Sequence, residues 1–151
     1  MGAFAALLGL SLAIDDSDAR QVGKFDAIAV GDSCIFQVRG TKMISRFPLQ
    51  TSDQFNSRPV LLSSLPSNND LALQAVQVQE GEWRTDDRFL LMTDALACWF
   101  LRECEQGKTP WQQLCAFGIN DGTEPFADWI AGLRANGSLK NDDVTLLRIV
   151  M

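Results

Sequence analysis

Three acidic positions in the sequence lie where an apolar segment begins, ends or breaks. Asp32 interrupts FDAIAVGDSCIFQV, Asp94 follows RFLLMT, and Asp142 with Asp143 precedes VTLLRIV. A carboxylate at the rim of an apolar sheet is costly to remove from water unless it is hydrogen-bonded, paired or bound to a cation. The pattern therefore predicts a site for a hard divalent cation, and Mg²⁺ or Mn²⁺ fits oxygen ligands better than zinc does. The alternative is that Asp32 and Asp142 accept hydrogen bonds from turn backbone N–H groups.

The composition narrows the chemistry that is available. The 151 residues include 13 Lys and Arg against 19 Asp and Glu, a net charge of −6, and no basic cluster, so we expect no nucleic acid partner. The chain has no histidine, which excludes Ser/His/Asp and Cys/His nucleophiles and imidazole zinc sites. Any catalysis must come from carboxylates, thiols or metal-bound water.

The cysteines and the N-terminal segment indicate the cellular compartment that is expected for this protein. The four cysteines form no CxxC pair and are expected to be buried free thiols of a reducing cytoplasm: Cys34, Cys98, Cys104 and Cys115. The apolar residues 3–14 have no basic stretch before them and are followed by DDSDAR rather than by a small-residue cleavage site. We expect a buried strand there in a cytoplasmic protein with no membrane partner, and a targeting segment is the alternative.

Apolar and β-branched runs predict the strands that position these residues. We expect strands over residues 3–14, over 25–40 as one long strand or two short ones broken at GDS, over 71–79 before a turn at Glu80–Gly81, over 88–93 and over 144–150, with short pieces at 44–47 and 60–62. The remainder of residues 41–69 is rich in Pro, Ser and Asn and is expected to be a loop that faces a partner.

Three helices are indicated by their ends and by their apolar faces. The first follows Asp94 and places Ala97, Phe100, Leu101 and Cys104 on one face. The second, residues 111–117, has Thr109 as N-cap and Pro110 at its first position, and ends at Gly118. The third, residues 126–135, starts at Pro125 and carries a core-facing stripe of Phe126, Trp129, Ile130 and Leu133. Strands, then helices, then a strand predict a single α+β domain over residues 1–151.

Several of these segments resemble one known family. GDSCIFQVRG (31–40), RFLLMTDALACWFL (88–101) and KNDDVTLLRI (140–149) are similar, in order and spacing, to consecutive motifs of the metal-dependent protein phosphatases, the PPM-type or phosphatase 2C family. These motifs are GDSR before an apolar strand, SDG or TDG at a strand end, and DN or DD shortly before a Thr in the last strand. GAFAALLGLSLA also resembles the family's Gly-small-Thr strand, so the resemblance spans essentially the whole chain.

The resemblance implies a fold and a reaction. The fold would be an αββα sandwich of two antiparallel sheets flanked by helices, with a two-metal Mg²⁺ or Mn²⁺ site between them. By position, Asp94 and Asp142 would be ligands of the metal pair, and Asp32 would help to bind a weaker extra metal. Other residues would support these ligands from the turns: Asp143, Gly31 and Ser33. The reaction would be hydrolysis of phosphoserine or phosphothreonine in a phosphoprotein substrate by metal-activated water, with no catalytic residue beyond the metal ligands.

The chain departs from the family pattern at three places. Cys34 stands at the position of the Arg in GDSR, and Ala95 stands where the family has Gly, which reduces backbone freedom at the metal turn. The family's DG motif, whose Asp bridges the metals, is not matched in order by Asp121–Gly122. We therefore expect an N-terminally incomplete domain, the C-terminal two-thirds of the family domain, with weak or no activity.

Two alternatives remain open. One is a non-catalytic, pseudophosphatase-type module that binds a regulatory protein partner. The other is an unrelated α+β domain whose strand-end aspartates do not converge in space.

Overall fold

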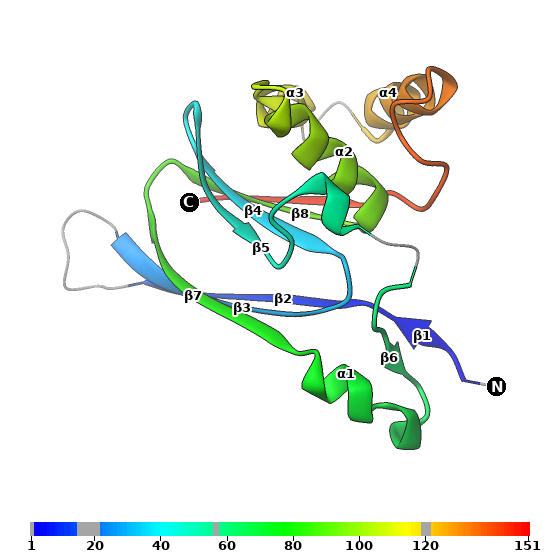
Figure 1. Cartoon of the computed structure of the whole chain (residues 1–151). Helices are drawn as coiled ribbons and strands as arrows, with labels where there is room; N and C mark the ends of the chain where they lie inside the picture. Colours follow the sequence, from blue (N-terminus) through cyan, green and yellow to red (C-terminus); the bar gives the residue numbers. More distant parts are fainter. Residues whose placement is uncertain (1, 15–21, 56–57, 119–121) are drawn as a thin grey trace.

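The computed structural model describes residues 2–14, 22–55, 58–118 and 122–151, which form a mixed α+β fold with antiparallel sheets (Figure 1). The strands are β1 (Phe4–Ala5), β2 (Leu7–Ile14), β3 (Val22–Val30), β4 (Cys34–Arg39), β5 (Lys42–Phe47), β6 (Leu62–Ser63), β7 (Gln77–Arg84), β8 (Asp87–Met92) and β9 (Leu146–Val150). The α-helices are α1 (Asp70–Gln74), α2 (Asp94–Glu105), α3 (Pro110–Ala116) and α4 (Glu124–Ala135), and two 3₁₀ turns are η1 (Ser52–Gln54) and η2 (Pro66–Asn68).

Two of the three sheets pack face to face. One has the strand order β2-β3-β7 and the other β5-β4-β8-β9, with antiparallel neighbours throughout, while β1 and β6 form a separate two-stranded pair. Phe25 of β3 meets Phe89 of β8 edge to face between the sheets, with ring centroids 5.2 Å apart. These buried rings form the centre of the inter-sheet core, which removes a large apolar area from water.

Helices α2, α3 and α4 cover the other face of the four-stranded sheet (Figure 1). Phe36 of β4 lies against Phe100 of α2 with ring centroids 4.3 Å apart, and Phe100 in turn approaches Trp111 of α3. The central part of the four-stranded sheet is therefore covered on both faces. The outer face of the three-stranded sheet differs, because Ile28 and Val78 remain exposed there among the described residues.

The predicted break at GDS separates two strands that belong to different sheets. β3 ends at Val30 in one sheet and β4 begins at Cys34 in the other. Gly31 has a φ of +104°, and a Cβ there would lie 2.9 Å from the Cβ of Ala6. Glycine allows this turn because it has neither the steric penalty at positive φ nor the Cβ.

The prediction for residues 71–79 is wrong in its first half. These residues begin in the short helix α1, where Leu71 and Leu73 are 71% and 66% exposed and only Ala72 is buried. The predicted turn at Glu80–Gly81 is also wrong, since β7 runs through it. The strand has a glycine at position 81 because a Cβ there would come within 2.5 Å of the Phe25 ring. The glycine marks a close approach of the backbone to a buried ring, as isolated strand glycines often do.

The other strands and helices lie near their predicted positions, with some corrections. The N-terminal segment is a strand, but β2 is half exposed rather than buried and pairs only with β3 among the described strands. The piece expected at 60–62 begins at Leu62, and the hydroxyl of Thr109 contacts the side chain of Gln112 instead of capping the backbone of α3. In α4 only Ile130 of the predicted stripe is fully buried, and its other members pack at the margin of the core.

All four cysteines are free thiols, as expected, but only Cys34 is fully buried. The other three are half buried, because α2 and α3 present them at the margin of the helical layer. Of the helices that the structure describes, none has the length and apolar character needed to cross a membrane.

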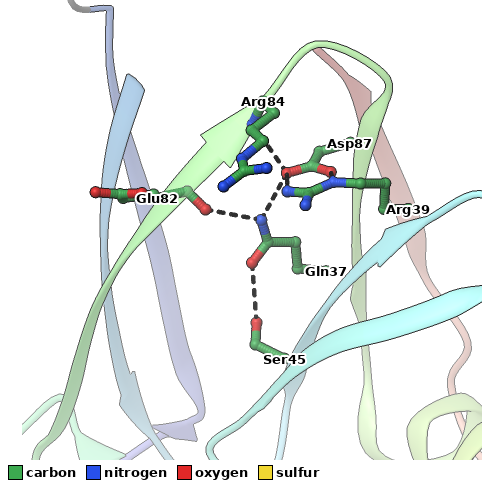
Figure 2. A network of polar contacts seen from close by, with 6 residues as sticks. All are labelled: Gln37, Arg39, Ser45, Glu82, Arg84 and Asp87. Atoms are coloured by element: carbon green, nitrogen blue, oxygen red, sulfur yellow. Dashed lines mark hydrogen bonds and ion pairs between the residues drawn. The ribbon is translucent and has the colours of Figure 1, made fainter. Parts of the chain in front are cut away.

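A buried polar network ties the two sheets together near the β7–β8 turn (Figure 2). Asp87 of β8, with no exposed surface, accepts hydrogen bonds from Arg39 Nε and Nη2 at 2.5 and 2.8 Å, from Gln37 Nε2 at 2.8 Å and from the Arg84 backbone N–H at 2.9 Å. Gln37 Nε2 also donates to the carbonyl of Glu82 at 2.9 Å. Since Gln37 belongs to β4 and Glu82 to β7, the network crosses from one sheet to the other.

Candidate functional site

The three predicted ligand positions lie at one end of the four-stranded sheet. Cys34 of β4 pairs with Met92 of β8, and Met92 pairs with Leu146 of β9. Asp32 precedes β4, Asp94 follows β8, and the Asp142 turn precedes β9. Antiparallel pairing in this register brings the three connections to the same end of the sheet, although they are far apart in the sequence.

Lys140 joins two of the aspartates directly. Its Nζ lies 2.9 Å from Asp142 Oδ2 and 4.0 Å from Asp94 Oδ2. Asp32, Asp94 and Lys140 also line one pocket of about 270 Å³, which α2 bounds on one side. The structure thus places Asp94 and Asp142 beside one ammonium group and Asp32 in the same pocket as Asp94 and Lys140, whereas an unrelated domain with incidental aspartates was expected to keep them apart.

The charges in this cluster shift one another's protonation. Burial raises the pKa of Asp32, and the carboxylate of Asp94 raises it further. The hydrogen bond from Lys140 lowers the pKa of Asp142, and that from the Asp143 backbone adds to the effect. The same contact with Asp142 raises the pKa of Lys140. Three carboxylates and one ammonium leave an excess of negative charge, and burial together with the neighbouring carboxylates makes Asp32 harder to ionise.

The turn that carries Asp142 is held by several hydrogen bonds. Asp142 Oδ1 accepts from the backbone N–H of Asp143 at 2.9 Å, the Asp142 N–H donates to the carbonyl of Lys140 at 3.0 Å, and Arg134 donates to the carbonyl of Asp142. The turn role that was the alternative for Asp142 is therefore present together with its ion pair. One side-chain oxygen supports the turn and the other meets Lys140.

Thr93, the residue before Asp94, connects this turn to the end of β8 through two hydrogen bonds. Its hydroxyl donates to the carbonyl of Asp143 at 3.1 Å and accepts from the Thr145 N–H at 2.9 Å. Asp143 thus supports the site through its backbone. Gly31 permits the turn before Asp32, and Ser33 links Asp32 to β4.

Sequence reasoning missed Thr93 and Lys140. Thr93 was visible as the residue before the strand-end Asp, and Lys140 as a cation two positions before Asp142. Neither position reveals its partner without the register of β8 and β9.

Two of the departures from the family pattern have structural explanations. The Cys34 side chain is fully buried under the helical layer, where burial raises its pKa to about 12, so it supplies neither a cation nor a thiolate to the pocket. Ala95 lies in the first turn of α2 and is itself helical. The reduction in backbone freedom expected from Ala95 has no effect here, because a helical position needs no glycine.

The donor types suit a hard cation, but the ligand set is not assembled. Carboxylate oxygens are the ligands that Mg²⁺ and Mn²⁺ prefer. In the parts of the chain that the structure describes, no three His, Cys, Asp or Glu side chains lie close enough together to hold a metal ion as they stand. Lys140 occupies the position between Asp94 and Asp142, and a cation shared by these two carboxylates would have to displace it.

Comparison with known proteins leaves the family open. No family model, no curated protein and no solved structure matches this chain.

Proposed function

We propose that this chain is a Mg²⁺- or Mn²⁺-dependent serine/threonine protein phosphatase-like domain of the phosphatase 2C type, with weak or no activity by itself. The observation that carries the proposal is the convergence of Asp32, Asp94 and Asp142 at one end of the four-stranded sheet. Two antiparallel sheets packed face to face, with α2, α3 and α4 on one of them, match part of the αββα arrangement, while Ile28 and Val78 on the outer face of the other sheet are exposed.

Different residues of the chain would have different roles in phosphomonoester hydrolysis. Divalent ions held by the three aspartates would lower the pKa of water, so that it attacks phosphorus without a histidine base. Arg102 lines the same pocket and would be able to pair with phosphate oxygens, whereas Lys140 would do so only after a cation displaced it from Asp94 and Asp142.

Mn²⁺ binding and hydrolysis test the proposal together. We expect calorimetry to detect a Mn²⁺ site of millimolar or tighter affinity, and p-nitrophenyl phosphate hydrolysis above background to require Mn²⁺. Asp94→Asn should weaken both, since it removes one charged oxygen ligand. Asp128→Asn on the exposed face of α4 is the matched control and should change neither. Mn²⁺ affinity that is the same in Asp94→Asn and in Asp128→Asn would refute the site.

Lys140 is the observation that favours the second candidate, a non-catalytic binding or regulatory module. Its ammonium already pairs with Asp142 and lies near Asp94, so these carboxylates have a counter-ion without any metal. Lys140→Met separates the candidates. A phosphatase-like site should bind Mn²⁺ more tightly when the competing ammonium is removed, whereas a module in which lysine substitutes for the metal should show no Mn²⁺ site in either form.

A further inference from the structure

A second hollow lies on the helical side of the four-stranded sheet and shares no residue with the aspartate pocket. Its volume is about 430 Å³, and its floor is formed by β8 and β9. One wall is formed by Cys115 near the end of α3 and by Phe117 and Gly118. We call it the β9 groove. Its size falls within the range of roughly 300–1,000 Å³ that is usual for small-molecule sites.

Two arginines project from the floor of the β9 groove. Arg88 of β8 lies opposite Val150, and Leu90 lies opposite Arg148, so the two arginines are diagonal neighbours on one face of the sheet. Diagonal Cα atoms in an antiparallel pair are only about 7–8 Å apart, within reach of long side chains. Two guanidinium groups at this spacing repel each other unless an anion lies between them.

The described residues supply no such anion. Among the residues that the structure describes, no acidic side chain lines the groove, although the chain carries a net charge of −6. Arg148 Nη1 donates to the carbonyl of Leu114 at 2.9 Å, which fixes this guanidinium against α3 and leaves its other donors available. Arg88 is exposed and makes no ion pair with any described residue.

The remaining lining is apolar. Phe117 follows α3, and Leu146 and Val150 lie on the same face of β9 as Arg148. Val150 is 68% exposed, so its side chain presents apolar surface to a ligand. The groove therefore combines two guanidinium forks with an apolar surface, a match for a ligand that has an anionic end and an apolar body.

We propose that the β9 groove binds a small organic anion whose carboxylate or phosphate pairs with Arg88 and Arg148 and whose apolar body packs on Phe117, Leu146 and Val150. The planar fork of arginine gives two parallel hydrogen bonds to either group. Binding here does not rest on the proposed phosphatase function, because it needs neither a metal nor the aspartate cluster.

Binding is measured by ¹⁵N NMR titration of the whole chain in EDTA, which silences any metal-dependent reaction. The probes are 2-naphthoate and 2-naphthyl phosphate, with 2-naphthol as the uncharged control. We expect saturable shifts at the amides of Phe117 and residues 146–150, with a dissociation constant on the order of 1 mM or below for at least one anion. 2-Naphthol should bind much more weakly, and the stronger of the two anions identifies the head group.

Variants assign the binding to the arginines. Arg88→Gln should weaken the anion about tenfold or more, as loss of a charge-assisted pair does, and Arg88→Lys should recover part of the loss. Lys42→Gln removes one exposed positive charge at the opposite edge of the same sheet and should change the affinity less than about twofold. The exposed side chain of Arg88 makes no hydrogen bond or ion pair with any described residue, so its substitution is expected to leave the fold intact.

Cys115 offers a second readout, because its half-buried thiol lines the groove. A bound anion should slow alkylation of Cys115 and leave that of Cys98, outside the groove, unchanged. The proposal is overturned if neither anion saturates, if 2-naphthol binds as well as the anions, or if Arg88→Gln behaves like Lys42→Gln.

Discussion

Asp87→Asn should destabilise the fold more than any other isosteric change of a charged residue in the described chain. The side chain of Asp87 is completely buried, while that of its partner Arg39 is 33% exposed. Although burial raises the pKa of Asp87, hydrogen bonds from Arg39, the Arg84 backbone and Gln37 outweigh it and hold the pKa below its usual value. The folded state therefore prefers the ionised carboxylate.

The magnitude follows from the four hydrogen bonds that Asp87 accepts (Figure 2). An asparagine at position 87 can place its carbonyl where Oδ2 receives three donors, but the acceptor is then neutral, and each bond loses on the order of 0.5–1 kcal/mol. Its amide then faces Arg39 Nε, donor against donor, which costs about 1 kcal/mol more. The sum is roughly 3 kcal/mol, at the low end for breaking a buried ion pair because Arg39 still reaches water.

Urea unfolding followed by tryptophan fluorescence measures this loss, and its pH dependence tests the cause. Because the folded pKa is depressed, the ionised Asp87 stabilises the protein above the unfolded pKa of about 3.9, and this stabilisation is lost as the pH falls through the folded pKa. The difference between the wild type and Asp87→Asn should therefore be largest near pH 7 and shrink below about pH 4.

The matched control is Asp26→Asn, an exposed position on β3, which should change the stability by less than about 0.5 kcal/mol. A difference between Asp87→Asn and the wild type that stays constant from pH 7 to pH 3, or that is no larger than that of Asp26→Asn, would refute the reasoning.

Three further predictions concern other parts of the fold. Gly81→Ala should cost about 1–3 kcal/mol in urea unfolding, because the new Cβ meets the Phe25 ring at 2.5 Å; a neutral result would mean that the ring moves freely. Cys34 should resist iodoacetamide in the native protein at pH 8 and react only after unfolding, since burial raises its pKa to about 12; rapid native labelling, seen by peptide mass spectrometry, would contradict this. Thr93→Val should speed hydrogen exchange at the Thr145 amide by removing its acceptor, and unchanged exchange would show that this hydrogen bond does not hold the turn.

The site-bearing elements were predictable because their signals are local. The apolar run of β8 ends one residue before Asp94, where the apolar face of α2 begins, and the NDD turn precedes the run of β9. Each boundary is a change of hydrophobic period, which the sequence shows directly. That the aspartates share one end of the sheet follows only if β8 pairs with both β4 and β9, and no single segment of the sequence contains that pairing.

The failures come from positions where tertiary packing overrides a local pattern. Residues 71–79 alternate well enough for a strand, yet the first of them form a one-turn helix whose leucines are mostly exposed. Gly81 indicates a turn by its residue type and is instead fixed by a ring from another strand. The β9 groove had no sequence signal at all, since Arg88 and Arg148 become neighbours only through the pairing of β8 with β9.

The two charged clusters at the ends of β8 are expected to have different roles: one stabilises the fold, and the other affects cation binding. The Asp87 pair precedes the strand interior and is buried, so it contributes to stability and its loss should unfold the protein more easily. The Lys140 pairs with Asp94 and Asp142 at the other end are between exposed groups, which water screens, so they stabilise the fold little. Substitution at Lys140 should consequently leave the urea midpoint nearly unchanged while it changes the cation affinity of the aspartates. A large shift of the midpoint in Lys140→Met would instead mean that the lysine holds the β9 turn in place, and its effect on Mn²⁺ binding would then reflect the turn and not competition for the carboxylates.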